Sequence, residues 1–217
     1  MTKRFSENEI AAIYKVIAER RDMRHFVSAP VDPALLERIL QAAHLAPSVG
    51  FMQPWRFIRI TDNNLRKKIH QLAEQERIKT AKAMGEREDE FMRLKVEGIL
   101  ECGELLIVAL MANRQQYIFG RRTMPEMDLA SAACAIQNMW LASRAEGLGM
   151  GWVSLFEPKQ LHQLLDIPND AKAIAILCLG HVAEFYSKPM LEIEDWASRE
   201  KLQDLVFENT WKEKPEY

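Results

Sequence analysis

The sequence predicts an α+β sandwich, and three observations lead to this fold class. Helix and strand signals follow one another without a regular βαβ repeat. The runs 105–110 and 173–179 are continuously apolar and of strand length, which is typical of sheet strands covered on both faces. The 217 residues, 48% of them hydrophobic, are enough to build one compact core. We therefore expect a single domain over residues 1–217.

The first elements are expected to be two helices and a strand. Residues 6–20 open with a Ser-x-x-Glu capping box and then carry apolar residues at helical spacing. The Asp-Pro pair at 32–33 gives the N-cap and first-turn signals of a second helix, which should end near Pro47. Residues 55–60 are rich in β-forming residues and are followed by turn signals, so a strand is predicted there.

The later elements differ from one another in charge. Residues 65–101 are strongly charged without a continuous apolar stripe, which predicts helices joined by an exposed segment, a candidate lid. Residues 127–145 are nearly free of charge, so we expect a helix that is buried all round or lies at a subunit interface. The glycine-rich run 147–151 should end this helix. A short strand over 152–156 and a helix over 158–165 are expected to follow.

Composition argues against several classes of function. The net charge of -2 provides no global positive field for nucleic acid or an anionic membrane. No apolar run reaches the roughly 18 residues that span a bilayer, and no apolar leader opens the chain, so we expect a cytoplasmic protein. The cysteines lack CxxC spacing and are expected to be reduced core thiols, while the histidines lack metal-ligand spacing and no metal is predicted. These residues are Cys102, Cys134 and Cys178, and His25, His44, His70, His162 and His181.

Three arginines lie within five positions at the predicted end of the first helix. Arg20, Arg21 and Arg24 offer a density of guanidinium groups that suits bidentate contacts with a phosphate. The alternative is a solvated last turn whose cations complement the helix dipole. This segment alone does not separate the two interpretations.

The loop 46–55 combines two prolines, a glycine and two aromatic residues. Such a loop has a rigid shape and can present backbone amides beside a flat apolar wall. The alternative is a well-packed connection anchored by Trp55.

Together these segments resemble the nitroreductase superfamily. The resemblance rests on Arg20-Arg21-Asp22-Met23-Arg24, on Ala46-Pro47-Ser48 with Gln53-Pro54-Trp55-Arg56-Phe57, and on the glycine-rich run before Trp152. It covers nearly the whole chain in order and spacing. It implies a three-layer fold with a central, mainly antiparallel sheet flanked by helices, and a domain-swapped homodimer with FMN sites at the subunit interface.

The resemblance also assigns roles to individual residues. The arginine motif would surround the flavin phosphate and pyrimidine edge, Pro47 and Ser48 would reach the same flavin from the partner subunit, and residues 152–154 would lie along the ring near N5. Arg199 matches a C-terminal phosphate-binding cation, and Lys95 comes from the helix that faces the ring. The implied FMN-binding set is Arg20, Arg21, Asp22, Met23, Arg24, Pro47, Ser48, Lys95, Trp152, Val153, Ser154 and Arg199.

Within the superfamily, the sequence is similar to the BluB branch. Asp22 stands where serine or threonine is common and Phe51 where asparagine is common, and Gly151-Trp152-Val153-Ser154 matches the branch. The branch comprises 5,6-dimethylbenzimidazole synthases, which consume reduced FMN and dioxygen. This implies that FMN is a substrate and that erythrose 4-phosphate is released.

Two residues are the candidates for catalysis. Asp22, set among arginines, is expected to stay ionised and to act as an acid or base when reduced FMN reacts with dioxygen. Ser154 is expected to position the reacting groups through its hydroxyl. The alternatives are an aspartate that merely orders Arg20 or Arg24, and an ordinary strand hydroxyl.

Three functions remain open on the sequence. The first is oxygen-dependent fragmentation of reduced FMN, with electrons from NADH or NADPH directly or through a separate flavin reductase. The second is an NAD(P)H-dependent nitroreductase, quinone reductase or dehalogenase that retains its flavin. The third is a flavin-storage or flavin-sensing protein without catalysis.

Overall fold

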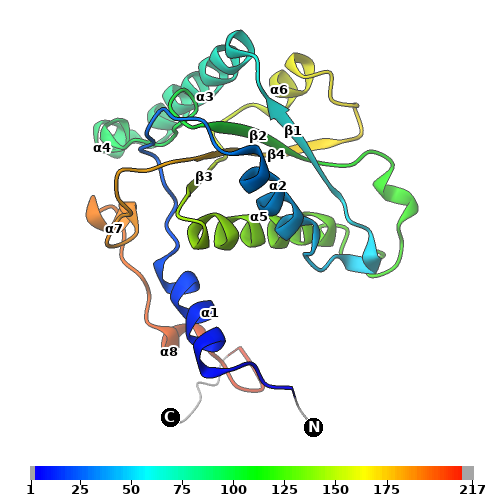
Figure 1. Cartoon of the computed structure of the whole chain (residues 1–217). Helices are drawn as coiled ribbons and strands as arrows, with labels where there is room; N and C mark the ends of the chain where they lie inside the picture. Colours follow the sequence, from blue (N-terminus) through cyan, green and yellow to red (C-terminus); the bar gives the residue numbers. More distant parts are fainter. Residues whose placement is uncertain (1–2, 212–217) are drawn as a thin grey trace.

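The computed structural model describes residues 3–211 and contains a four-stranded antiparallel sheet between two helical layers (Figure 1). The strand order is β1-β2-β4-β3, and every pairing is antiparallel. This confirms the α+β class, the three layers and the antiparallel sheet. The strands are β1 (Trp55–Ile60), β2 (Glu104–Leu110), β3 (Gly149–Val153) and β4 (Lys172–Gly180).

The helices cover both faces of this sheet. In Figure 1, α2 and α5 lie on one face and α3 and α6 on the other, while α1 projects away from the body beside the C-terminal segment that contains α8. The α-helices are α1 (Glu7–Glu19), α2 (Pro33–His44), α3 (Asn63–Ala83), α4 (Glu88–Arg93), α5 (Met127–Ala145), α6 (Pro158–Leu164), α7 (Met190–Ile193) and α8 (Leu202–Leu205). Short 3-10 turns are η1 (Val49–Phe51), η2 (Gly85–Arg87) and η3 (Arg114–Gln116).

The two central strands separate two hydrophobic clusters. Every residue of β2 is buried, because its side chains alternate between the α2/α5 face and the α3/α6 face. Leu106 and Val108 pack in the first cluster and Leu105 and Ile107 in the second. The continuous apolar runs therefore correspond to strands covered on both faces, as predicted.

The strand predicted at 152–156 is wrong in position. β3 begins at Gly149, which pairs with Gly180, and ends at Val153, which pairs with Ile176. The glycines that look like helix-ending residues therefore lie inside a strand. Beyond Val153 the strand ends, and the Phe156 N–H donates to the Ser154 carbonyl at 3.1 Å. Ser154 is exposed.

Helix α5 has the predicted bounds, but in the single chain it is not buried all round. Ile136 and Met139 are fully buried against the sheet, whereas Leu129 is 37% exposed and Cys134 is also exposed. The expectation of three core thiols is therefore wrong for Cys134 and right for Cys102 and Cys178, which are buried. The exposed side of α5 lies away from the sheet.

Helix α1 is stabilised at its start by the predicted capping box. The Glu9 N–H donates to the Ser6 hydroxyl at 3.4 Å, and the Ser6 N–H donates to the Glu9 carboxylate at 2.8 Å. We expect Ser6→Ala to lower the free energy of unfolding by about 1 kcal/mol or less, since α1 has no buried residue to add to the loss. Chemical denaturation with circular dichroism measures this change, and an unaltered midpoint would contradict it.

Candidate active site

The arginine segment lies against the edge strand of the sheet. The Met23 N–H donates to the Met150 carbonyl at 3.0 Å, and Asp22 forms an isolated parallel bridge with Met150. The Met23 side chain is only 1% exposed. A Cβ atom placed on Gly151 would lie 2.2 Å from the Met23 carbonyl oxygen, so a glycine is required where the two segments meet. This contact fixes where the flanking residues Asp22 and Arg24 point.

The backbone of Trp152 holds Asp22 and Arg24 together. The Trp152 N–H donates to Asp22 Oδ1 at 3.0 Å, and the Arg24 guanidinium donates to Asp22 Oδ2 at 2.5 Å and to the Trp152 carbonyl at 2.9 Å. Arg24 is buried, and its Nη1 has no hydrogen-bond partner among the described residues. The carboxylate is therefore fixed in orientation, while one buried guanidinium nitrogen keeps unused donors.

The pKa of Asp22 is shifted in the direction opposite to the one that its arginine neighbours alone would give. Burial raises the pKa of this carboxyl above its ordinary value, and Arg24, the Trp152 N–H and Arg20 oppose the rise without cancelling it. The Asp22 side chain nevertheless remains 42% exposed. The charge of the neighbouring arginines alone therefore does not set this pKa, because the loss of hydration outweighs it.

Asp22 lies in a cavity of about 270 Å³ that also contains Ser154. Both candidate catalytic residues therefore border one space, together with Trp152 and Val153. The opposite walls come from the end of α3, from α4 and the segment that follows it, and from residues 190–196, which include α7. The lining residues are Asp22, Arg24, Met84, Phe91, Leu94, Val96, Trp152, Val153, Ser154, Leu155, Met190, Leu191 and Trp196.

Sequence reasoning missed the C-terminal wall of this cavity. Trp196 packs against Phe91, with ring centroids 6.2 Å apart, and the Arg87 guanidinium lies 3.6 Å from the Trp196 ring centroid. Tyr186 also reaches the arginine segment, because its hydroxyl accepts from the Arg24 N–H at 3.2 Å. The aromatic residues after β4 are the only sequence signal for this wall that we can identify. No periodic pattern connects them to residues 84–96, so the sequence does not predict that the two segments meet.

The remaining arginines lie beside the cavity rather than in its lining. The Arg20 guanidinium stacks 4.5 Å from the Trp140 ring centroid. Burial lowers the pKa of Arg20, Asp22 raises it, and the charges of Arg21 and Arg199 lower it further. The charges of Arg21 and Arg199 therefore both act on the Arg20 guanidinium.

The Arg21 guanidinium makes its hydrogen bonds to backbone carbonyls of the protein itself. Its guanidinium donates to the carbonyls of Ala18 at 2.7 Å and Arg20 at 2.8 Å, and to that of Ser187 at 2.9 Å. Arg21 thus caps the end of α1, which is the structural alternative considered for the cluster. Arg20 and Arg199 remain the candidates for a phosphate.

Pro47 and Ser48 lie next to the start of α5, whereas the arginine segment lies near the other end of this helix. The Val49 N–H donates to the Ser131 hydroxyl at 3.0 Å, whereas the Trp140 indole N–H donates to the Arg21 carbonyl at 3.0 Å. Ser131 and Trp140 are nine positions apart on this helix, a rise of about 13.5 Å. Within one chain, the structure does not bring the 47–48 segment to the arginine segment.

Lys95 also lies outside the cavity lining. Its ammonium group pairs with Glu101 at 2.9 Å, while its neighbours Leu94 and Val96 border the cavity. The role of Lys95 in binding FMN stays a prediction.

The site suits a phosphorylated molecule with a flat aromatic part. Trp152, Phe91 and Trp196 supply apolar walls, and Arg20 with Arg199 supplies positive charge beside them. FMN combines an aromatic ring with a phosphate and fits this set.

Comparison with known proteins identifies the family. Residues 17–181 match the Nitroreductase family, and the chain belongs to that family. The family is FMN-linked, and its proteins are typically homodimers. The predicted superfamily is thereby confirmed.

Individual relatives agree with the predicted branch. The chain is 41% identical over 182 residues to the 5,6-dimethylbenzimidazole synthase of Rhodospirillum rubrum, covering 83% of this chain and 86% of that protein. It is 36% identical to the enzyme of the same name from Rhodobacter capsulatus, covering 88% and 94%. The crystal structure of an iodotyrosine deiodinase bound to FMN and 3-iodo-L-tyrosine shares the fold, with a TM-score of 0.72 and 22% identity over 92% of this chain and all of that one.

Among the described residues, no helix has the length and apolar character needed to cross a membrane.

Proposed function

We propose that this protein is a 5,6-dimethylbenzimidazole synthase, which converts reduced FMN and dioxygen to 5,6-dimethylbenzimidazole with release of erythrose 4-phosphate and of the oxidised pyrimidine part of the ring. The observation that carries the proposal is the placement of Asp22 and Ser154 in one cavity. Both residues are set there by the same short segment, Trp152 to Ser154, in a chain that is 33–41% identical to three enzymes of this name. Reduced FMN supplies both the electrons and the carbon skeleton of the product.

Different residues of the chain bind the substrate, transfer a proton and orient the reacting groups. Arg20 and Arg199 hold the phosphate by charge, and Arg24 holds the Asp22 carboxylate in place beside the ring. Asp22 exchanges a proton with the bound molecule at its Oδ2, the oxygen that Arg24 contacts. Ser154, exposed on the cavity wall, orients the reacting groups through its hydroxyl.

Two further parts of the proposal concern access and assembly. Met84, Phe91, Leu94 and Val96 border the cavity from the 65–101 region, which supports its role as a lid that excludes water. Pro47 and Ser48 would contact the flavin of the partner subunit in a domain-swapped homodimer, which accounts for their distance from the arginine segment of their own chain. The FMN is itself reduced beforehand by NADH or NADPH, directly or through a separate flavin reductase.

Product analysis tests the proposed function. The purified protein is mixed with chemically reduced FMN in air, and the products are analysed by mass spectrometry. We expect 5,6-dimethylbenzimidazole to appear as FMN disappears. Intact FMN after many equivalents of dioxygen would contradict the proposal. In that case, steady NAD(P)H consumption with a nitroaromatic or quinone would indicate a flavin-retaining reductase, and tight FMN binding without turnover would indicate a storage protein.

Replacing Ser154 by alanine is expected to slow product formation by roughly 100-fold, as loss of one positioned hydrogen-bonding group does in other active sites. Because Ser154 is exposed on the cavity wall and has no hydrogen bond from its hydroxyl to another described residue, stability should not change. FMN affinity, measured by fluorescence quenching, should stay within a factor of two or so. Full activity in the variant would remove Ser154 from the mechanism.

A further inference from the structure

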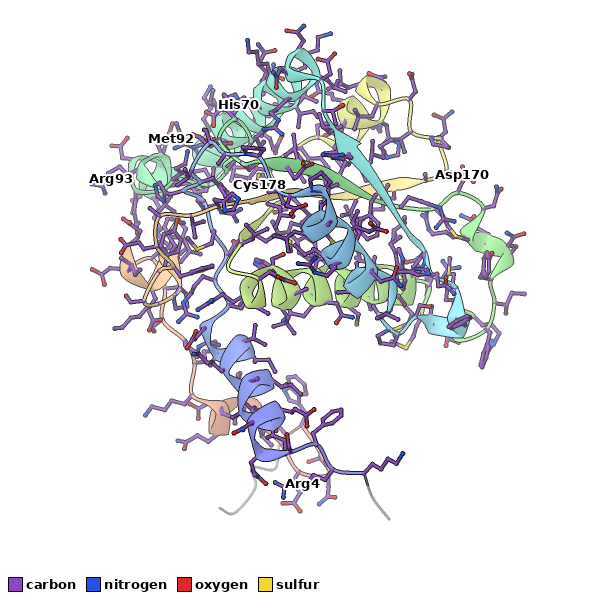
Figure 2. All side chains as sticks on the ribbon, viewed as in Figure 1. Arg4, His70, Met92, Arg93, Asp170 and Cys178 are labelled. Atoms are coloured by element: carbon purple, nitrogen blue, oxygen red, sulfur yellow. The ribbon has the colours of Figure 1, made fainter. Side chains whose placement is uncertain are left out.

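A histidine and two glutamates from separate segments converge beside the cavity. His70 and Glu74 lie one turn apart on α3, and Glu97 lies in the segment after α4. Each offers a ligand atom, and these atoms all lie within 4.8 Å of one another. Figure 2 shows His70 on α3, the helix that carries two of the three residues. Residues i and i+4 share one face of a helix, so both side chains reach Glu97 from the same side.

The existing contacts leave one oxygen of each glutamate for a further ligand. Glu97 Oε2 accepts from the Ile99 N–H at 2.5 Å, while Oε1 faces His70 Nε2 at 3.6 Å. Glu74 Oε1 pairs with Arg77 at 3.3 Å, which leaves its Oε2. Arg77 is itself positioned by the carbonyls of Met92 at 2.6 Å and Leu94 at 3.0 Å, so it does not depend on Glu74 for its place.

From this convergence we infer that His70, Glu74 and Glu97 form a binding site for a divalent transition-metal cation such as Zn²⁺. One imidazole nitrogen and two carboxylate oxygens are the ligand types that such ions accept, with water completing the coordination. Metal–ligand bonds of about 2.0 to 2.2 Å place ligand atoms roughly 3 to 4.4 Å apart. The observed spacing reaches this range with side-chain adjustments of a few tenths of an ångström. The imidazole ligand favours a transition-metal ion over Mg²⁺, because Mg²⁺ prefers oxygen ligands and retains its waters.

A metal ion at this site would connect two segments of the chain. Glu97 belongs to the segment whose residues Leu94 and Val96 border the flavin cavity, whereas His70 and Glu74 belong to the long helix α3. A bound ion therefore fastens one wall of the cavity to the helical layer behind it. None of the three ligands lines the cavity, so metal binding can be measured independently of the proposed reaction.

The test uses the full-length, untagged protein after removal of bound metal with a chelator. Zn²⁺ is titrated into the protein by isothermal titration calorimetry, and thermal unfolding is followed with and without Zn²⁺. The test variants are His70→Ala and Glu74→Gln. The matched controls are Glu76→Gln, a glutamate on the same helix that pairs with Lys79 at 3.6 Å, and His181→Ala, an exposed histidine beyond β4.

We expect one Zn²⁺ per chain and a higher melting temperature with Zn²⁺ for the wild type and both controls. In each test variant, affinity should fall by about tenfold or more, and the rise in melting temperature should disappear. Circular dichroism without metal confirms that the variants are folded. The inference is overturned if the wild type takes up no Zn²⁺, or if His70→Ala and Glu74→Gln bind it as well as the controls do.

Discussion

Replacing Asp22 by asparagine is expected to lower the rate of 5,6-dimethylbenzimidazole formation by about 10²- to 10⁴-fold, the range typical of losing a general acid or base. Asparagine has nearly the shape of aspartate and can still accept the Trp152 N–H, which now lies 3.0 Å from Oδ1. It has no ionisable proton, and its amide nitrogen would face the Arg24 donor. Arg24 keeps its second acceptor, the Trp152 carbonyl at 2.9 Å. The variant should therefore fold and bind FMN without turning it over.

The pH dependence of the reaction gives a second readout for Asp22. Burial raises the pKa of this carboxyl, so its ionised form is lost at a higher pH than for an ordinary aspartate. If Asp22 accepts a proton in the reaction, activity falls as the pH is lowered through this raised pKa. The acidic limb of the rate profile should thus lie above the usual range for aspartate, and it should be absent from the residual activity of Asp22→Asn.

A matched control separates catalysis from the loss of an ion pair. Glu19 has the same side-chain exposure as Asp22, 42%, and pairs with Arg144 at 2.5 Å, yet it does not line the cavity. Glu19→Gln should keep nearly full activity and an unchanged pH profile. Equal losses in Glu19→Gln and Asp22→Asn would assign Asp22 a structural role only, which is the alternative that the sequence leaves open.

Elements marked by a continuous local pattern could be predicted from the sequence. The run 127–145, which is nearly free of charge, matches α5, and the β-rich run 55–60 matches β1. In both cases the local pattern and the packing agree, so local reasoning is sufficient. The positions of Asp22 and Ser154 in one cavity were predicted through the family resemblance, and the structure places them there.

The features that were missed depend on contacts between distant segments. The start of β3 at Gly149 was missed because glycines usually weaken a strand, whereas here they let Met23 approach closely. The C-terminal wall of the cavity depends on the packing of Trp196 against Phe91, which lies more than 100 residues earlier in the chain. The raised pKa of Asp22 depends on how much water the folded chain removes, which the neighbouring arginines in the sequence do not reveal.

Replacing Gly151 by alanine is expected to disrupt both stability and FMN binding. The added Cβ atom would lie 2.2 Å from the Met23 carbonyl oxygen and 3.0 Å from Arg24 Nη1. The first contact is with backbone, so the arginine segment must move away from β3, and the Met23–Met150 hydrogen bond at 3.0 Å would be strained or lost. Overpacking with backbone displacement costs about 1 to 3 kcal/mol of unfolding free energy, and occasionally more.

Gly147→Ala is the control for this prediction, because Gly147 lies in the same glycine-rich run but has open space at its Cβ position. Its positive φ of 77° gives alanine a backbone penalty of about 1 kcal/mol, without a clash against the arginine segment. Denaturant unfolding and FMN fluorescence quenching should therefore show a moderate stability loss with normal affinity for Gly147→Ala. For Gly151→Ala, we expect a larger stability loss and FMN affinity reduced by at least about tenfold, since Asp22 and Arg24 move with Met23. If Gly151→Ala binds FMN normally, contact between the arginine segment and β3 does not set the geometry of the site.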